Sequence, residues 1–246
     1  MSAALIGTNI SYIALTFLPP VVWLLFYLRE DRRHPEPKYL LILAFAGGIA
    51  SALLAIAGEC AFINILGSSC KEGINTTVSI FYLFLGIALI EEYLKYLAVK
   101  LLILRKTAFD EPIDAMIYMM TSALGFAALE NALFIFPMFQ QNVFSGLEVA
   151  ANRFLGANLL HALSSGIVGF FLARAWFHPK RHHFVAIGII IATLLHAAFN
   201  YLILVKEALP QGTFYLILLL SIMAVVIFID FEKLKKMRIE NELPHE

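Results

Sequence analysis

The sequence predicts an all-α fold: a polytopic helical membrane protein with about seven transmembrane helices. Its 246 residues are 61% hydrophobic and have a mean hydropathy of +0.82, whereas soluble domains are roughly 45–50% apolar. The apolar residues gather in stretches long enough to cross a bilayer. No soluble domain fits between these stretches, so we expect one helical transmembrane domain over residues 1–229 and a polar cytoplasmic tail over residues 230–246.

Seven stretches reach the length of about 20 residues that a helical span needs. The first has no basic region or cleavage site near it, so we expect it to be a retained anchor. Small residues such as Gly47, Gly48 and Ala123 favour close helix packing in the second and fourth. The third to sixth contain the polar residues described below, and the seventh is short. The expected spans are Asn9–Leu28, Tyr39–Leu66, Val78–Leu104, Ile113–Pro137, Ala151–Phe177, Phe184–Val205 and Phe214–Ile229.

Basic residues are concentrated in alternate connections between the spans. Because cytoplasmic loops are enriched in Lys and Arg, we expect the N-terminus outside and the C-terminus in the cytoplasm. Most of the 18 Lys and Arg residues are then cytoplasmic. These are Arg29, Arg32, Arg33, Lys38, Lys100, Arg105, Lys106, Arg174, Lys180, Arg181, Lys233, Lys235, Lys236 and Arg238, against Lys71, Arg153 and Lys206 outside.

Net charge and cysteine content limit the possible partners. The formal net charge of +0 gives no reason to expect a nucleic-acid partner. The 2 cysteines are too few for a disulfide framework or a thiolate metal site. Cys60 and Cys70 fall at the outer end of the second span and in the loop after it. A disulfide and two unpaired thiols both fit these positions.

The third span contains charged residues at its centre. Glu91, Glu92 and Lys95 lie within the apolar stretch Val78–Leu104. A charge at bilayer depth costs about 2.5–3.5 kcal/mol on insertion scales and usually has a function. Helical spacing places Lys95 near both acids, so it can neutralise one carboxylate while the other stays free. The competing interpretation is a structural ion-pair cluster between helices.

Three further spans carry polar residues at a similar depth. Glu130 lies in the fourth span, His161 in the fifth, and His196 with Asn200 in the sixth. At about 1.5 Å per residue, the cluster positions fall about 10–20 Å below the outer ends of their spans. We expect the four spans to direct these side chains into one cavity. The competing interpretations are interhelical hydrogen bonds for the histidines and an orienting acid for Glu130.

These residue types suit hydrolysis of an amide bond in the membrane. Two imidazoles and a carboxylate, with a water in the open position, form many hydrolytic zinc sites, and a second carboxylate can act as base. The candidate metal ligands are Glu92, Glu130, His161 and His196. A metal-free alternative, in which a glutamate takes a proton from a water oriented by the histidines, stays open.

The chain resembles, over most of its length, the PrsW family of intramembrane proteases, relatives of the type II CAAX prenyl endopeptidases. The family motif EExxK is similar to Glu91–Lys95, FxxxE to Phe126–Glu130, and the first family histidine to His161. The last motif, HxxxD or similar, matches His196–Asn200, with Asn where PrsW-like chains often have Asp. A neutral amide there suits an oxyanion donor better than a metal ligand or a base.

The resemblance implies an intramembrane endopeptidase, metallo- or glutamate-type, in a bacterial plasma membrane. It implies cleavage of a membrane-anchored protein, such as an anti-sigma factor, close to the outer surface in a site-1-type reaction. The implied cofactor is Zn²⁺, with the metal-free mechanism as the alternative, and the oligomeric state stays open. The implied catalytic residues are Glu91, Glu92, Lys95, Glu130, His161, His196 and Asn200.

Two other functions could use the same residues. A proton-coupled transporter would relay protons through the intramembrane acids and histidines, but the sequence shows no inverted repeat or paired broken helices. A non-catalytic membrane scaffold would bind membrane proteins without needing the histidines. Ser164 and Ser165, which follow His161, are interpreted as small residues that allow close helix packing rather than as nucleophiles.

Overall fold

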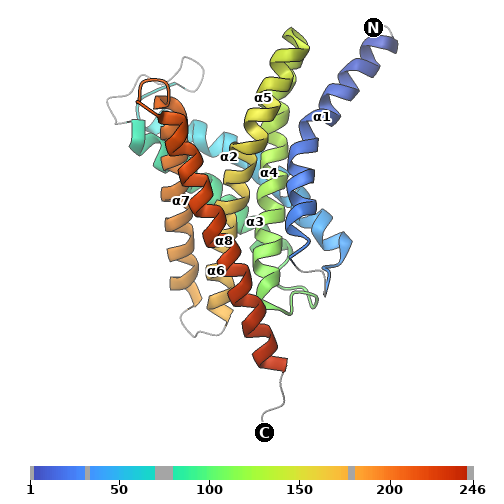
Figure 1. The fold of residues 1–246 in the computed structure, drawn as a ribbon, viewed down its shortest axis with the longest axis vertical. Helices are drawn as coiled ribbons and strands as arrows, with labels where there is room; N and C mark the ends of the chain where they lie inside the picture. The colour runs from blue at the N-terminus through green and yellow to red at the C-terminus, as the bar shows by residue number, and fades with distance from the viewer. Residues whose placement is uncertain (1–2, 31–33, 70–79, 177–180, 243–246) are drawn as a thin grey trace.

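The computed structural model describes residues 3–30, 34–69, 80–176 and 181–242, and these are helical apart from the connections (Figure 1). The expected all-α class is therefore confirmed. The described helices are α1 (Ala3–Tyr27), α2 (Lys38–Ile65), α3 (Ile80–Leu102), α4 (Pro112–Gln141), α5 (Val143–Leu155), α6 (Ala157–Trp176), α7 (Arg181–Val205) and α8 (Gly212–Glu242).

The helices run back and forth between two ends of the molecule. In Figure 1, α1 descends from the upper end, α2 returns to it, and later helices keep alternating, except that α5 and α6 both descend. The N-terminus and the C-terminus therefore lie at opposite ends. This path agrees with an odd number of crossings, as the alternating basic connections predict. Which end faces the cytoplasm stays a prediction.

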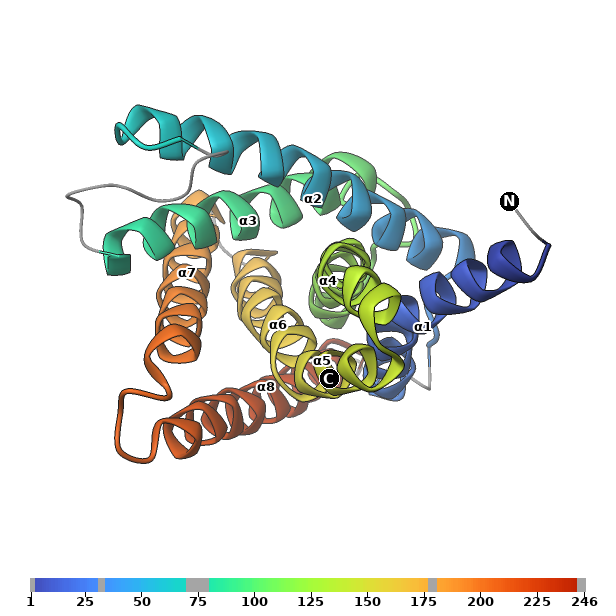
Figure 2. The same cartoon turned by 90° about the horizontal axis from the view of Figure 1, so that it is seen from above.

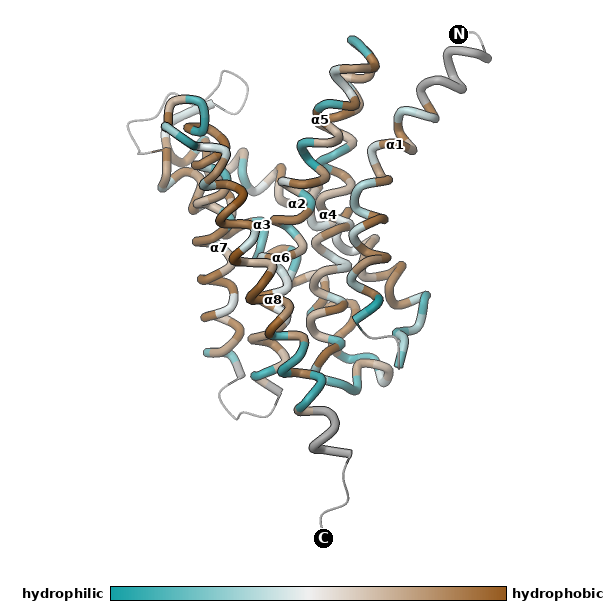
Figure 3. Tube along the Cα trace, viewed as in Figure 1, coloured by the Kyte–Doolittle hydropathy of each residue, from teal (hydrophilic) through white to brown (hydrophobic). Residues whose placement is uncertain are grey.

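Length and composition identify a multi-pass membrane protein. The expected third span is α3, which has 23 residues. It carries the intramembrane acids and lysines, so its middle is more highly charged than the middle of the other membrane helices. Hydrophobic residues dominate the middle of the molecule, while hydrophilic residues gather at the lower end and the upper tips (Figure 3). Within the part of the chain that the structure describes, six segments are long and apolar enough to cross a membrane: Ile10–Tyr27, Lys38–Ile65, Pro112–Gln141, Val143–Ala175, His182–Val205 and Gly212–Met237.

The structure departs from the expected spans at two places, before α6 and at the end of α8. A separate helix, α5, precedes α6 and ends at Leu155, with Gly156 as its C-cap. Its polar residues interrupt the apolar pattern, and the expected span therefore starts at Ala151, inside α5. At the other end, α8 continues well past Ile229 to Glu242. Phe231 and Leu234 share a helix face and are buried, so the beginning of the expected tail packs against the bundle.

α4 lies at the centre of the bundle (Figure 2). Every residue from Pro112 to Ala128 is buried, and the helix contacts α1, α2, α3, α5, α6 and α8. The close approach of α2 fixes its position. A Cβ atom on Gly48 would lie 1.9 Å from the carbonyl oxygen of Ser122, and one on Gly125 would lie 2.0 Å from that of Phe45. Only glycine fits at these two crossings, and they set the height of α4 in the bundle.

A larger residue at the helix crossing is expected to destabilise the fold. Gly125→Leu would drive a side chain into the backbone of α2, so we expect at least the roughly 1–3 kcal/mol typical of overpacking. Thermal unfolding of the detergent-solubilised protein would measure this as a lower melting temperature. Gly58→Ala is the matched control, because its added Cβ would meet only the Ile90 methyl group at 3.2 Å. Equal melting temperatures for the two variants would contradict this account of the crossing.

Candidate active site

Four helices bring ionisable side chains into one buried cluster, as the sequence predicts. α6 lies between α4 and α7, with α3 alongside (Figure 2). The exposed fractions are 4% for Glu91, 0% for Glu92 and Lys95, and 2% for His161 and His196. The side chain of Glu130 is 23% exposed. The cluster is therefore closed from lipid and reaches the surface mainly through Glu130.

Glu92 accepts hydrogen bonds from donors on three helices. Its Oε1 accepts from Lys95 Nζ at 2.9 Å, from Ser164 Oγ at 2.9 Å and from His196 Nδ1 at 2.9 Å. Its Oε2 accepts from Ser165 Oγ at 2.9 Å. A buried charge is tolerated when it is paired and hydrogen-bonded. Glu92 therefore ties α3 to α6 and α7, and the two serines donate to it as well as permitting close packing.

The hydrogen bonds fix the orientation and tautomer of both histidines. His161 Nδ1 lies 2.9 Å from Lys95 Nζ, which can only donate, so His161 Nε2 carries the proton and donates to Glu130 Oε2 at 2.7 Å. His196 Nδ1 donates to Glu92 Oε1, which leaves the lone pair on Nε2. Both rings are thus held by a carboxylate on one nitrogen and present the other nitrogen as an acceptor.

The two acceptor nitrogens face the same carboxylate oxygen. Glu91 Oε2 lies 3.9 Å from His161 Nδ1 and 3.8 Å from His196 Nε2, and ligand atoms of the three residues lie within 4.8 Å of one another. A tetrahedral zinc ion with bonds of about 2.0–2.1 Å holds two ligand atoms about 3.3–3.4 Å apart, so these side chains would close in by about 0.5 Å around a bound ion. Lys95 Nζ, itself a cation, lies 3.4 Å from Glu91 Oε2. The three residues could hold a metal ion, and Lys95 Nζ, which lies 2.9 Å from His161 Nδ1, would have to move aside for it.

This geometry separates two kinds of acid in the cluster. Glu91 belongs with His161 and His196 to the group that could hold a metal ion. Glu130 and Glu92 instead bind the ring nitrogens that face away from that group, Glu130 on His161 and Glu92 on His196. Carboxylates in that second position orient metal-binding histidines in many proteins. The expectation that Glu92 and Glu130 are ligands stays a prediction, and the structure adds Glu91 as a stronger candidate.

Arg153 is a member of the cluster that sequence reasoning left among the outer basic residues. From α5, its Nη2 donates to Glu130 Oε2 at 2.9 Å and its Nε donates to Asn131 Oδ1 at 2.6 Å. Asn131 also donates to Asn158 Oδ1 at 3.0 Å, and Asn158 donates to the Arg153 carbonyl at 2.8 Å. The sequence did contain a signal for this network: Asn131 follows Glu130 directly, and Asn158 comes three residues before His161.

Asn200 lies apart from this hydrogen-bond network. It is half-buried on α7, one turn after His196. Within the described part of the chain its side chain makes no hydrogen bond. Its expected role as an oxyanion donor is therefore still a prediction.

Buried histidines and carboxylates on membrane-crossing helices define an intramembrane enzyme whose donor set is that of a hydrolytic metal site. The chain belongs to the PrsW family of intramembrane metalloproteases, whose family model matches residues 36–228. The expected resemblance is thus confirmed, and the protein is an endopeptidase of membrane protein substrates. The family favours this function over a carrier or a scaffold.

Several curated bacterial relatives cover most of the chain. The protein named protease PrsW from Geobacillus kaustophilus (strain HTA426) is 30% identical over 200 residues, 80% of this chain and 81% of the relative. That from Clostridioides difficile (strain 630) is 26% identical over 227 residues, 90% and 89% of the two chains. That from Bacillus subtilis (strain 168) is 27% identical over 225 residues, 91% and 94%. No solved structure matches the chain.

Loss of the Arg153 ion pair is expected to lower turnover. Arg153→Gln would release Glu130, which holds His161, and partners in this position typically contribute 10–100-fold, so we expect a fall of about that size. Cleavage of a fluorogenic single-span peptide should show the change in kcat rather than KM, because Arg153 touches Glu130 and not the substrate.

Two companion variants separate a positioning role from a general loss of fold. Arg153→Lys keeps the charge and should restore part of the turnover, and Arg174→Gln, at the other end of the bundle, should change little. Unchanged kcat in Arg153→Gln, or no rescue by lysine, would show that the ion pair does not position Glu130.

Proposed function

We propose that the protein hydrolyses a peptide bond in a membrane-anchored protein, near the outer end of the substrate's span. The observation that carries the proposal is the convergence of Glu91 Oε2 with the acceptor nitrogens of His161 and His196. An anti-sigma factor with a single span is a substrate of the required kind. The cleavage would then be of the site-1 type.

Glu91, His161 and His196 would hold the metal, for which Zn²⁺ is the proposed identity. Two imidazoles and one carboxylate form a common zinc ligand set in hydrolases. The bound ion would supply a nucleophilic water at neutral pH and polarise the substrate carbonyl. The metal-free alternative would assign the proton acceptor to Glu91, the acid nearest to both acceptor nitrogens.

The remaining residues have distinct proposed tasks. Glu92 holds His196, and because donors occupy both of its oxygens it serves as an anchor. Glu130 holds His161 with Oε2, while Oε1 makes no hydrogen bond within the described residues. Glu130 is also the most exposed acid of the cluster, which suits proton transfer to and from the site. Lys95 balances the charge of Glu91 and Glu92.

Two features support access from the outer side. The exposed members of the cluster are Glu130, in the second half of α4, and Arg153, on α5. The end of α4 and the start of α5 meet at the upper end of the bundle, opposite the C-terminus (Figure 1). Cys60, near the upper end of α2, is disulfide-bonded, and disulfides persist in oxidising compartments. Cys70 lies outside the described residues. Both features favour the orientation with the lower end in the cytoplasm.

Metal content gives the first test of the proposed site. We expect about one zinc ion per chain in the purified protein by elemental analysis, and its loss in a His161→Ala, His196→Ala double variant, because two of three protein ligands are gone. Glu92→Gln should weaken metal affinity by about 10–100-fold, as expected for an orienting carboxylate.

The matched control for metal binding is His183→Ala, which removes an exposed histidine at the start of α7. Its metal content should equal that of the wild type. Zinc that remains bound in the double variant would exclude the proposed ligand set.

Cleavage gives the second test. We expect Glu91→Gln, His161→Ala and His196→Ala each to lower cleavage of a single-span peptide by at least about 100-fold, since each removes a ligand or its alignment. Mass spectrometry of the products should place the cut near the outer end of the peptide's span. Retained cleavage in all three variants would refute the proposed function, while a cut near the cytoplasmic end would refute only the orientation.

A further inference from the structure

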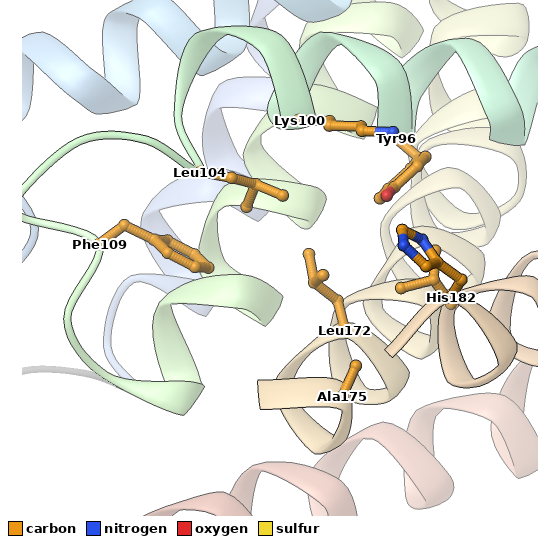
Figure 4. Close-up of a pocket in the computed structure, with 8 residues that line it drawn as sticks. Tyr96, Lys100, Leu104, Phe109, Leu172, Ala175 and His182 are labelled. Carbon is orange, nitrogen blue, oxygen red and sulfur yellow. The ribbon is translucent and has the colours of Figure 1, made fainter. Parts of the chain in front are cut away.

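A pocket separate from the buried cluster opens at the basic end of the bundle. It lies between the ends of α3 and α6, the start of α7 and the connection before α4, and has a volume of about 420 Å³. That is within the range of small-molecule sites, roughly 300–1,000 Å³. Figure 4 shows the residues that line it, and none of them belongs to the buried cluster.

The pocket has one polar side and one apolar side. In Figure 4, Tyr96, Lys100 and His182 gather at one side, and Leu104 and Phe109 lie at the other. Lys100 is exposed, with Nζ 5.7 Å from the centre of the Tyr96 ring. Leu172 projects between the two sides. The division matches a molecule with an anionic head and a hydrocarbon body.

Tyr96 adds a hydroxyl group to the polar side of the pocket. The residue as a whole is 8% exposed, and its hydroxyl makes no hydrogen bond within the described residues. The hydroxyl points into the pocket (Figure 4). The hydroxyl can donate a hydrogen bond to a ligand oxygen beside Lys100.

The surroundings favour an anion that is already in the membrane. This end of the bundle carries further basic residues: Arg105 and Lys106 in the connection after α3, and Arg174 in the last turn of α6. Basic pockets between transmembrane helices at the cytoplasmic side bind anionic lipid head groups. The Leu104 and Phe109 side of the pocket is suited to an acyl chain, since apolar walls stabilise hydrocarbon.

We propose that this pocket binds one anionic phospholipid, with the phosphate at Lys100, His182 and Tyr96 and an acyl chain against Leu104, Phe109 and Leu172. The three helices that line it also carry the cluster: Tyr96 directly follows Lys95 on α3, and α6 and α7 carry the two histidines. A bound lipid therefore contacts each of these helices and stabilises their relative position. This proposal does not depend on the cleavage chemistry.

Native mass spectrometry of the purified full-length chain can count and rank bound lipids. The probes are dioleoyl phosphatidylglycerol, which is anionic, and dioleoyl phosphatidylcholine, which has the same acyl chains and no net charge. We expect one phosphatidylglycerol to bind at least about tenfold more tightly than phosphatidylcholine. Lys100→Gln should weaken that binding by about fivefold, the effect expected for one basic residue near anionic lipid.

Two more variants make the test specific to the pocket. Leu172→Trp should remove the tight phosphatidylglycerol site by filling the pocket without changing charge. Lys38→Gln is the matched control, because Lys38 is an exposed lysine at the same end, on α2, and does not line the pocket. It should bind phosphatidylglycerol as the wild type does.

Three results would overturn the lipid proposal. Equal affinity for the two lipids would remove the role of the basic residues. Equal effects of Lys100→Gln and Lys38→Gln would assign the attraction to the general charge of this end. A tight site that survives Leu172→Trp would place the lipid outside the pocket. Melting temperatures of the variants without lipid should match the wild type, so a loss of binding reports on the site and not on folding.

Discussion

A carboxylate far from bulk water persists only where donors surround it, and the four donors on Glu92 provide that environment. Lys95 comes from the same helix, the two serines from α6 and His196 from α7. Removing Lys95 would leave a buried carboxylate without its counter-ion, and removing a serine or His196 would leave one of its oxygens with one hydrogen bond fewer. The packing of α3 against α6 and α7 is therefore tied to the chemistry of the site, because the same contacts support both.

Much of the site followed from sequence because helical spacing and apolar context are local properties. The pairing of Lys95 with both acids, and the burial of His161 and His196 at a common depth, needed only the period of a helix. Which acid faces the acceptor nitrogens depends on how each helix is rotated about its axis, and that is set by contacts between helices. Glu91 and Glu92 are adjacent in sequence but point to different ring nitrogens for this reason.

The fold shows the same division. Continuous apolar stretches predicted the membrane helices, whereas α5 and the extension of α8 combine polar and apolar residues and need tertiary contacts to be recognised. The sequence places Arg153 at the outer end of an expected span, but its contact with Glu130 depends on how α5 packs against α4. The central position of α4 likewise depends on Gly48 and Gly125, whose effect appears only where two backbones meet.

Lys95 lies among the atoms on which a metal would converge, at 2.9 Å from His161 Nδ1 and 3.4 Å from Glu91 Oε2. The chain thus supplies an internal counter-ion to its own acids. The ammonium group balances the acids of the closed cluster, so the contacts that hold α3 against α6 and α7 need no divalent ion. A metal ion at the atoms of Glu91, His161 and His196 would take over the place of a positive charge that the chain already carries.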